Sequence, residues 1–238
     1  MAEKATQPKG PLASLTAAVL LPYEAKYTRR RADMLRLALA ALGLCATGLL
    51  VSGSRVSAPE RRVFVFINRL PGTAEPVLWI VMQAGAFGAV FVAAGLALAA
   101  RRRRLAVALV AGGTGTWLAA KVVKLIVERA RPADLLHDVV IRGPAATSLG
   151  FPGLGFPSGH AAVATLIMTV AGPYLTRPAR WTGWVVVGLV AFNRVFIGAH
   201  FPLDVVGGFF LGWSIGSLVN LTFGTPDNAV LSGRSDPR

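Results

Sequence analysis

The chain has 238 residues, of which 54% are hydrophobic and only 15% are charged, and its mean hydropathy is +0.57. This composition excludes a soluble globular domain and predicts an integral membrane protein. The formal net charge is +14, but the basic residues cluster between apolar runs, which favours anionic lipid headgroups as partners and argues against nucleic acid.

The two ends of the chain are not predicted to cross the membrane. Residues 1–33 are polar or only briefly apolar, and the run Leu12–Leu21 is too short to span a bilayer. We expect a cytoplasmic N-terminal segment there, with an interfacial location as an option. Because no apolar core stands near Met1, no cleavable signal peptide is expected. Residues 224–238 are expected to form a disordered cytoplasmic tail.

Between these ends, residues 34–223 contain six apolar stretches that approach the length of a membrane span, which is about 20 residues. These spans are expected to be helical, because lipid offers no hydrogen-bond partners to backbone N–H and C=O groups that are not paired within the protein. We therefore predict an all-α fold, a polytopic bundle of six transmembrane helices that forms one domain. The predicted spans are Leu35–Val51, Pro76–Ala99, Leu105–Val127, Gly159–Leu175, Trp181–Ala199 and Val205–Phe223.

The arginine cluster Arg101–Arg104, between the second and third spans, is the strongest marker of orientation, because basic loops stay in the cytoplasm. Successive spans cross the membrane in opposite directions. Both termini are therefore expected in the cytoplasm, and the ends of spans one, three and five are expected outside. Segment 53–75 runs against this assignment because it adds arginines outside. The long connection Pro132–Pro157, between spans three and four, is predicted to be exterior and functional or disordered.

Two cations stand at the end of the third span. Lys124 and Arg131 are seven residues apart, so they point the same way if the helix continues that far. Ionisable groups in membrane spans are costly and usually functional, and these two could bind one anion. Glu128, four residues after Lys124, is predicted to be an ion-pair partner on the same face.

The fourth span opens with the tetrapeptide Pro157-Ser158-Gly159-His160. The free N–H groups and the dipole of a helix N-terminus favour a phosphate, and Gly159 would allow close approach. Alone the tetrapeptide is weak evidence, because Ser158 is also an ordinary N-cap in an ordinary turn.

A third group of polar residues surrounds the turn between the last two spans, where Pro202 interrupts the helix. The group comprises Arg194, His200 and Asp204. A carboxylate beside an imidazole can fix its tautomer and stabilise its protonated form. The histidines at 160 and 200 both flank predicted span ends on the exterior side, so the three groups are expected to converge.

The order and spacing of these three blocks resemble the motifs of the type 2 phosphatidic acid phosphatase superfamily. The blocks are Lys124-x6-Arg131-Pro132, Pro157-Ser158-Gly159-His160 and Arg194-x5-His200-x3-Asp204. The resemblance covers about residues 34–223. The family usually has a serine before the arginine of the third block, where this chain has Asn193. Since asparagine can also form hydrogen bonds, we expect altered detail rather than lost activity.

The resemblance implies a metal-independent phosphatase without a cofactor. It makes His200 the nucleophile that forms a phosphohistidine, while Asp204 orients and charge-stabilises it. His160 would protonate the leaving oxygen and later activate water. This division agrees with general phosphoryl-transfer chemistry. The residues that would bind the phosphate are Lys124, Arg131, Ser158, Gly159 and Arg194.

Other classes of function fit less well. A metal-dependent hydrolase could use His160, His200 and Asp204 as ligands, but three adjacent cations would repel a divalent ion. A non-catalytic lipid-binding protein would be expected to have lost a catalytic residue, and none is lost. A transporter would call for inverted repeats or paired broken spans, which the sequence does not display.

The expected substrate is a lipid phosphate, because the site lies at membrane depth. A small chain with an exterior site in a bacterial plasma membrane favours undecaprenyl diphosphate or another polyprenyl phosphate. Phosphatidic acid, phosphatidylglycerol phosphate and a phosphorylated polyprenyl sugar stay open. Membrane lipids are the other expected partners, and self-association is left open.

Overall fold

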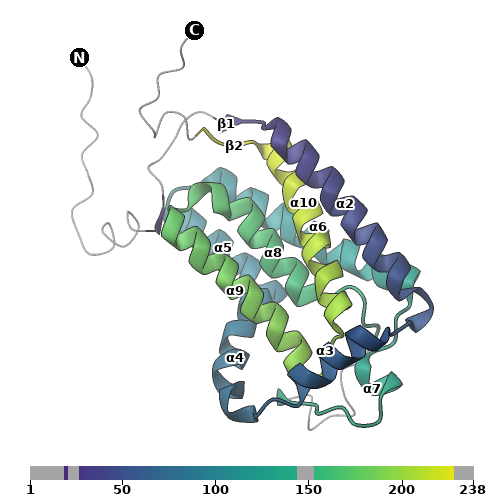
Figure 1. Cartoon of the computed structure of the whole chain (residues 1–238). Coiled ribbons are helices and arrows are strands. Elements are labelled where there is room, and N and C mark those ends of the chain that lie inside the picture. Colours follow the sequence, from purple (N-terminus) through teal and green to yellow (C-terminus); the bar gives the residue numbers. More distant parts are fainter. Residues whose placement is uncertain (1–18, 21–26, 144–152, 228–238) are drawn as a thin grey trace, which may run out of the picture.

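The computed structural model describes residues 19–20, 27–143 and 153–227 (Figure 1). Most of the predicted N-terminal segment and C-terminal tail lies outside the described residues, as do residues 144–152 of the predicted long loop. The helices are α2 (Arg31–Val51), α3 (Ala58–Asn68), α4 (Glu75–Met82), α5 (Phe87–Ala99), α6 (Arg103–Val127), α7 (Pro132–Leu135), α8 (Gly159–Ala171), α9 (Arg177–Phe196) and α10 (Pro202–Phe223). Single 3₁₀ turns are η1 (Ser52–Ser54), η2 (Gly72–Ala74), η3 (Gln83–Gly85) and η5 (Gly172–Tyr174), and the short strands are β1 (Tyr27–Thr28) and β2 (Thr225–Pro226).

The described chain is helical, as predicted, and three of its helical segments are long and apolar enough to cross a membrane: Arg31–Ser54, Arg103–Leu135 and Pro202–Phe223. A fourth span results if α4 and α5, which meet at a bend of 68°, are counted as one. Helices α8 and α9 lie at the predicted fourth and fifth spans, but α8 has only 13 residues. The count of six spans therefore stays a prediction.

The predicted second span, Pro76–Ala99, is wrong as a continuous helix. The chain passes from α4 through η3 to an extended Ala86 before α5 begins. Gly85 lies at this break, and a Cβ on it would come within 2.6 Å of the backbone oxygen of His160. The chain thus needs glycine here, because the break packs directly on the first turn of α8.

Segment 53–75 contains a helix, α3, that the hydropathy pattern did not predict. Ser57 is its N-cap, and the Ser57 hydroxyl accepts a hydrogen bond from the backbone N–H of Glu60 at 3.3 Å. Pro59 in the first turn is also favourable for a helix start. The helix packs against the start of α10 through the rings of Phe64 and Phe201, whose centroids are 5.1 Å apart.

Glycines allow α10 to pack tightly against α8 in the middle of the bundle. A Cβ on Gly208 would collide with the backbone oxygen of Ser158, and one on Gly212 with that of Ala162. Such small residues let membrane helices approach backbone to backbone. The close approach brings the two N-termini together, and the Ser158 N–H donates to the backbone oxygen of Asp204 at 2.8 Å.

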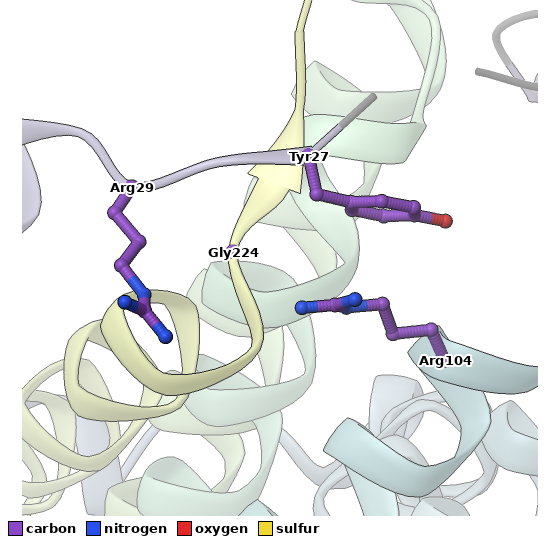
Figure 2. A pocket seen from close by; sticks show the side chains of 4 residues that line it. All are labelled: Tyr27, Arg29, Arg104 and Gly224. Atoms are coloured by element: carbon purple, nitrogen blue, oxygen red, sulfur yellow. The ribbon is translucent and has the colours of Figure 1, made fainter. Parts of the chain in front are cut away.

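The end of the bundle where α2 and α6 begin and α10 ends is closed by the antiparallel pair of β1 and β2 (Figure 1). There Arg104 lies over the Tyr27 ring, 4.6 Å from its centroid, and its Nε donates to the backbone oxygen of Phe223. Figure 2 shows the residues that line a cavity at this place, which are Tyr27, Arg29, Arg104 and Gly224. The cavity has a volume of about 500 Å³. It lies at the end opposite the predicted site.

Candidate active site

The polar residues singled out in the sequence converge at the end of the bundle where α6 and α9 finish and α8 and α10 begin (Figure 1). The charges of Arg194, Arg131 and Lys124 all act on His200. His160 also interacts electrostatically with His200, and with two of these arginines. Three separate sequence blocks thus form one polar cluster.

The reason given for pairing Lys124 with Arg131 is wrong, because α6 ends at Val127 and does not reach Arg131. Glu128 adopts a left-handed conformation (φ 48°, ψ 36°) that turns the chain. Arg131 instead reaches the site from the N-cap of α7. Glu128 is exposed and takes part in none of the ion pairs of the described residues, so its predicted pairing is not observed.

Backbone oxygens gather around two of the cations. Lys124 Nζ donates to the oxygens of Leu154 at 2.5 Å and Gly155 at 3.3 Å. Arg131 donates through Nε to the oxygen of Gly153 and through Nη1 to that of Ala199, both at 2.8 Å. Both side chains thus donate to backbone oxygens of residues 153–155, just before the Pro157-Ser158-Gly159-His160 block, and Arg131 also binds the segment that follows α9.

Arg194 is held differently. It is the last-turn cation of α9 and is only 5% exposed. Its Nη1 lies 3.1 Å from the sulfur of Met82, which is a weak acceptor. A phosphoryl oxygen is a much stronger acceptor for a guanidinium than a thioether sulfur is.

At the start of α8, Ser158 occupies the N-cap position but does not use its side chain as a cap. Its buried Oγ makes no hydrogen bond within the described part of the chain. A Cβ on Gly159 would meet no heavy atom of the described residues within 4 Å, so the helix N-terminus is open at that point. Both features leave room for an anion at the N–H groups of the first turn.

His200 lies between α9 and α10 and is 2% exposed. Its Nδ1 is 3.5 Å from Asp204 Oδ2, which also accepts a hydrogen bond from the Phe201 N–H at 2.9 Å. Burial, followed by the positive charge of Arg194 and other nearby cations, holds the pKa of the His200 imidazole well below its usual 6.5. The neutral form, which is the nucleophilic one, therefore dominates at neutral pH.

Two charged residues near this cluster were missed in the sequence. Arg129 is completely buried and donates to Asp204 Oδ1 at 2.7 Å and to both oxygens of Glu60. The Ser57-x-x-Glu60 spacing is a helix-start signal that could have revealed α3, but nothing in the sequence pairs Glu60 with Arg129.

Asn193, which replaces the serine usual in the family, donates to the backbone oxygen of Leu78 at 3.1 Å. It therefore ties α9 to α4 beside the site. Among the described residues, no three His, Cys, Asp or Glu side chains are grouped so that they could hold a metal ion.

Residues 103–226, more than half of the chain, match the model of the PAP2 superfamily. The chain belongs to the PAP2 superfamily. The fold agrees, because a transmembrane PAP2-type phosphatidylglycerolphosphate phosphatase from Bacillus subtilis superposes with a TM-score of 0.62 at 22% identity, over 79% of this chain and 95% of that one. Together with its candidate spans, this membership identifies the PAP2 chain as an integral membrane protein.

Several curated relatives of this PAP2 chain have named phosphatase activities, among them the following two. The undecaprenyl-diphosphatase of Sulfolobus acidocaldarius is 29% identical over 115 residues, which cover 47% of the chain and 52% of the relative. The decaprenylphosphoryl-5-phosphoribose phosphatase of Mycobacterium tuberculosis is 32% identical over 128 residues, which cover 52% of the chain and 64% of the relative. The match thus spans less than two thirds of the length of either relative.

Proposed function

We propose that the chain is a metal-independent membrane phosphatase that hydrolyses a lipid phosphate or diphosphate through a phosphohistidine at His200. The observation that carries the proposal is a buried imidazole, held neutral, whose Nδ1 lies toward Asp204 while three cations act on it. A nucleophile surrounded by cations suits an anionic phosphorus centre, whose charge would repel it elsewhere.

In the first step, Nε2 of His200 attacks phosphorus, and the bond from phosphorus to the leaving oxygen breaks. His160 donates a proton to that oxygen. In the second step, His160 removes a proton from water, which attacks phosphorus and releases inorganic phosphate from His200. Asp204 holds the imidazole and offsets the positive charge that it gains on phosphorylation.

Three cations bind the phosphoryl oxygens in this mechanism. Lys124 and Arg131 already donate to backbone oxygens of residues 153–155, and phosphoryl oxygens would replace these acceptors. Arg194 would exchange the sulfur of Met82 for a phosphoryl oxygen. Ser158 Oγ and the N–H groups at Gly159 complete the binding site. Such oriented charges stabilise the transition state because they need little reorganisation.

The lead substrate is undecaprenyl diphosphate or another polyprenyl phosphate. The two curated relatives support this choice, because their names specify undecaprenyl diphosphate and a decaprenyl phosphate derivative. Phosphatidic acid, phosphatidylglycerol phosphate and a phosphorylated polyprenyl sugar are the alternatives. We place the protein in a bacterial plasma membrane with the active site on the exterior face.

Purified protein with each of these four lipids, assayed for released phosphate, tests the proposal. We expect turnover to be fastest with undecaprenyl diphosphate, to persist in EDTA, and to be absent in His200→Ala. Loss of turnover in EDTA that magnesium or zinc restores would favour the metal-dependent hydrolase. Binding of lipid without release of phosphate, equal in wild type and His200→Ala, would favour a non-catalytic lipid-binding protein.

A further inference from the structure

A second buried ion network lies directly behind the His200–Asp204 pair. The guanidinium of Arg129 donates to Glu60 Oε1 at 3.1 Å and Oε2 at 2.8 Å, and to Asp204 Oδ1 at 2.7 Å. The side chains of Arg129 and Asp204 are 0% exposed and that of Glu60 is 3% exposed. One cation therefore binds two carboxylates in a region without solvent.

Glu60 also fixes the start of α10. Its Oε1 accepts a hydrogen bond from the Leu203 N–H at 3.0 Å, one residue before Asp204. The Arg129 guanidinium lies over the Phe201 ring, 4.8 Å from its centroid, and donates to the backbone oxygen of Arg55. The network thus joins α3, the turn after α6 and the first turn of α10, and it sets the position of the Asp204 carboxylate from the side away from His200.

The balance of charge in this network bears on the chemistry. If Arg129 formed an ion pair with Asp204 alone, the positive charge of Arg129 would cancel the field that Asp204 exerts on His200. Glu60 neutralises Arg129, so the three groups together keep one net negative charge. At low dielectric such charges act strongly, which makes this balance important for an imidazole that must become positively charged.

We propose that Glu60 and Arg129 are positioning residues for His200. Arg129 holds Asp204 in place, and Glu60 offsets Arg129 so that Asp204 keeps its negative charge toward the imidazole. Glu60 belongs to α3, outside residues 103–226 that match the family model. The inference rests on the proposed function, because it assigns these residues to the formation of the phosphohistidine.

Single-turnover labelling with a phosphate-labelled lipid substrate tests this inference. Glu60→Gln keeps the shape but removes the charge, so labelling should slow by about tenfold or more while KM changes by less than about twofold. Glu60→Gln/Arg129→Gln removes both charges and leaves Asp204 negative. This double variant should label faster than Glu60→Gln, which a merely structural role would not produce.

The matched control is Arg142→Lys. Arg142 also has several hydrogen bonds to backbone oxygens, those of Asn68, Phe196 and Leu70, but none to Asp204. The Arg142→Lys variant should acquire label at nearly the wild-type rate per folded molecule. Its folding is checked by gel filtration and thermal unfolding.

Wild-type labelling by Glu60→Gln, or a double variant slower than Glu60→Gln, would overturn the inference. If the labelling of Glu60→Gln fell only in proportion to the fraction of unfolded protein, the inference would be overturned as well. Failure of the proposed function is distinguishable, because the wild-type protein itself would then acquire no label.

Discussion

Both ends of the helical bundle are rich in arginine, yet they use it differently. At the end closed by β1 and β2, Arg104 packs on Tyr27 (Figure 2). Arg104 and the nearby Arg29 are exposed there, whereas Arg102 is buried. At the other end, Arg194 and Arg129 are buried beside histidine and carboxylate groups. Burying a charge is costly unless it is paired or functional, and buried arginines occur at both ends. What marks the active end is that its cations surround a buried histidine.

The comparison predicts its largest difference for two arginine variants. Arg194→Gln removes a cation from the phosphate site, so kcat/KM for the lipid substrate should fall by about 100-fold or more. Arg104→Gln, at the opposite end, should change it by less than about twofold, because screened surface charges contribute little. The measurement is released phosphate per folded protein. Equal losses of kcat/KM in the two variants would contradict a functional difference between the two ends.

A smaller effect is expected in the pH dependence. The neutral imidazole attacks, and the pKa of His200 is held well below 6.5 by burial and nearby cations. The neutral fraction should therefore stay constant as the pH falls from about 8 to 6.5. Labelling from an activated substrate, whose leaving group needs no proton, should be flat over this range. A midpoint near 6.5 would mean that His200 titrates as a solvent-exposed histidine does.

With a lipid substrate the pH profile of kcat/KM should differ, because His160 must then supply a proton to the leaving oxygen. The kcat/KM should fall as the pH rises and His160 loses its proton, and this fall should disappear when the leaving group is activated. A fall that persists with the activated substrate would argue against His160 as the proton donor.

Topology can be tested by chemical labelling with no change in activity expected. Asp138, whose side chain is 86% exposed, follows α7 at the active end, whereas Arg101 lies at the opposite end. The single cysteine of the chain, Cys45, is first replaced by alanine. In this background Asp138→Cys should react with an impermeant maleimide in intact cells, and Arg101→Cys only after permeabilisation. The reverse pattern would place the active site in the cytoplasm.

Helices that coincide with long apolar runs could be predicted from the sequence. Helices α2, α6 and α10 end at the predicted Val51, Val127 and Phe223 and begin within four residues of the predicted starts. These boundaries depend on local hydropathy and on nearby turn residues, which are visible in the sequence.

Features that depend on tertiary contacts could not be predicted in this way. The break between α4 and α5 follows from the approach of Gly85 to the backbone of His160, and the burial of Arg129 follows from Glu60, which is 69 residues away. The motif residues of the site could be chosen from their spacing. The residues that support Asp204 could not, because a salt bridge between distant segments has no local pattern.

The proposed mechanism requires that His200 carries the phosphoryl group. The direct measurement is to trap the labelled adduct in His160→Ala with an activated substrate and to map it by mass spectrometry after digestion at alkaline pH. Formation should persist in this variant while hydrolysis slows, so label should accumulate as an acid-labile, base-stable adduct on His200, and His200→Ala should acquire none. An adduct on Ser158, or labelling that survives in His200→Ala, would contradict the account.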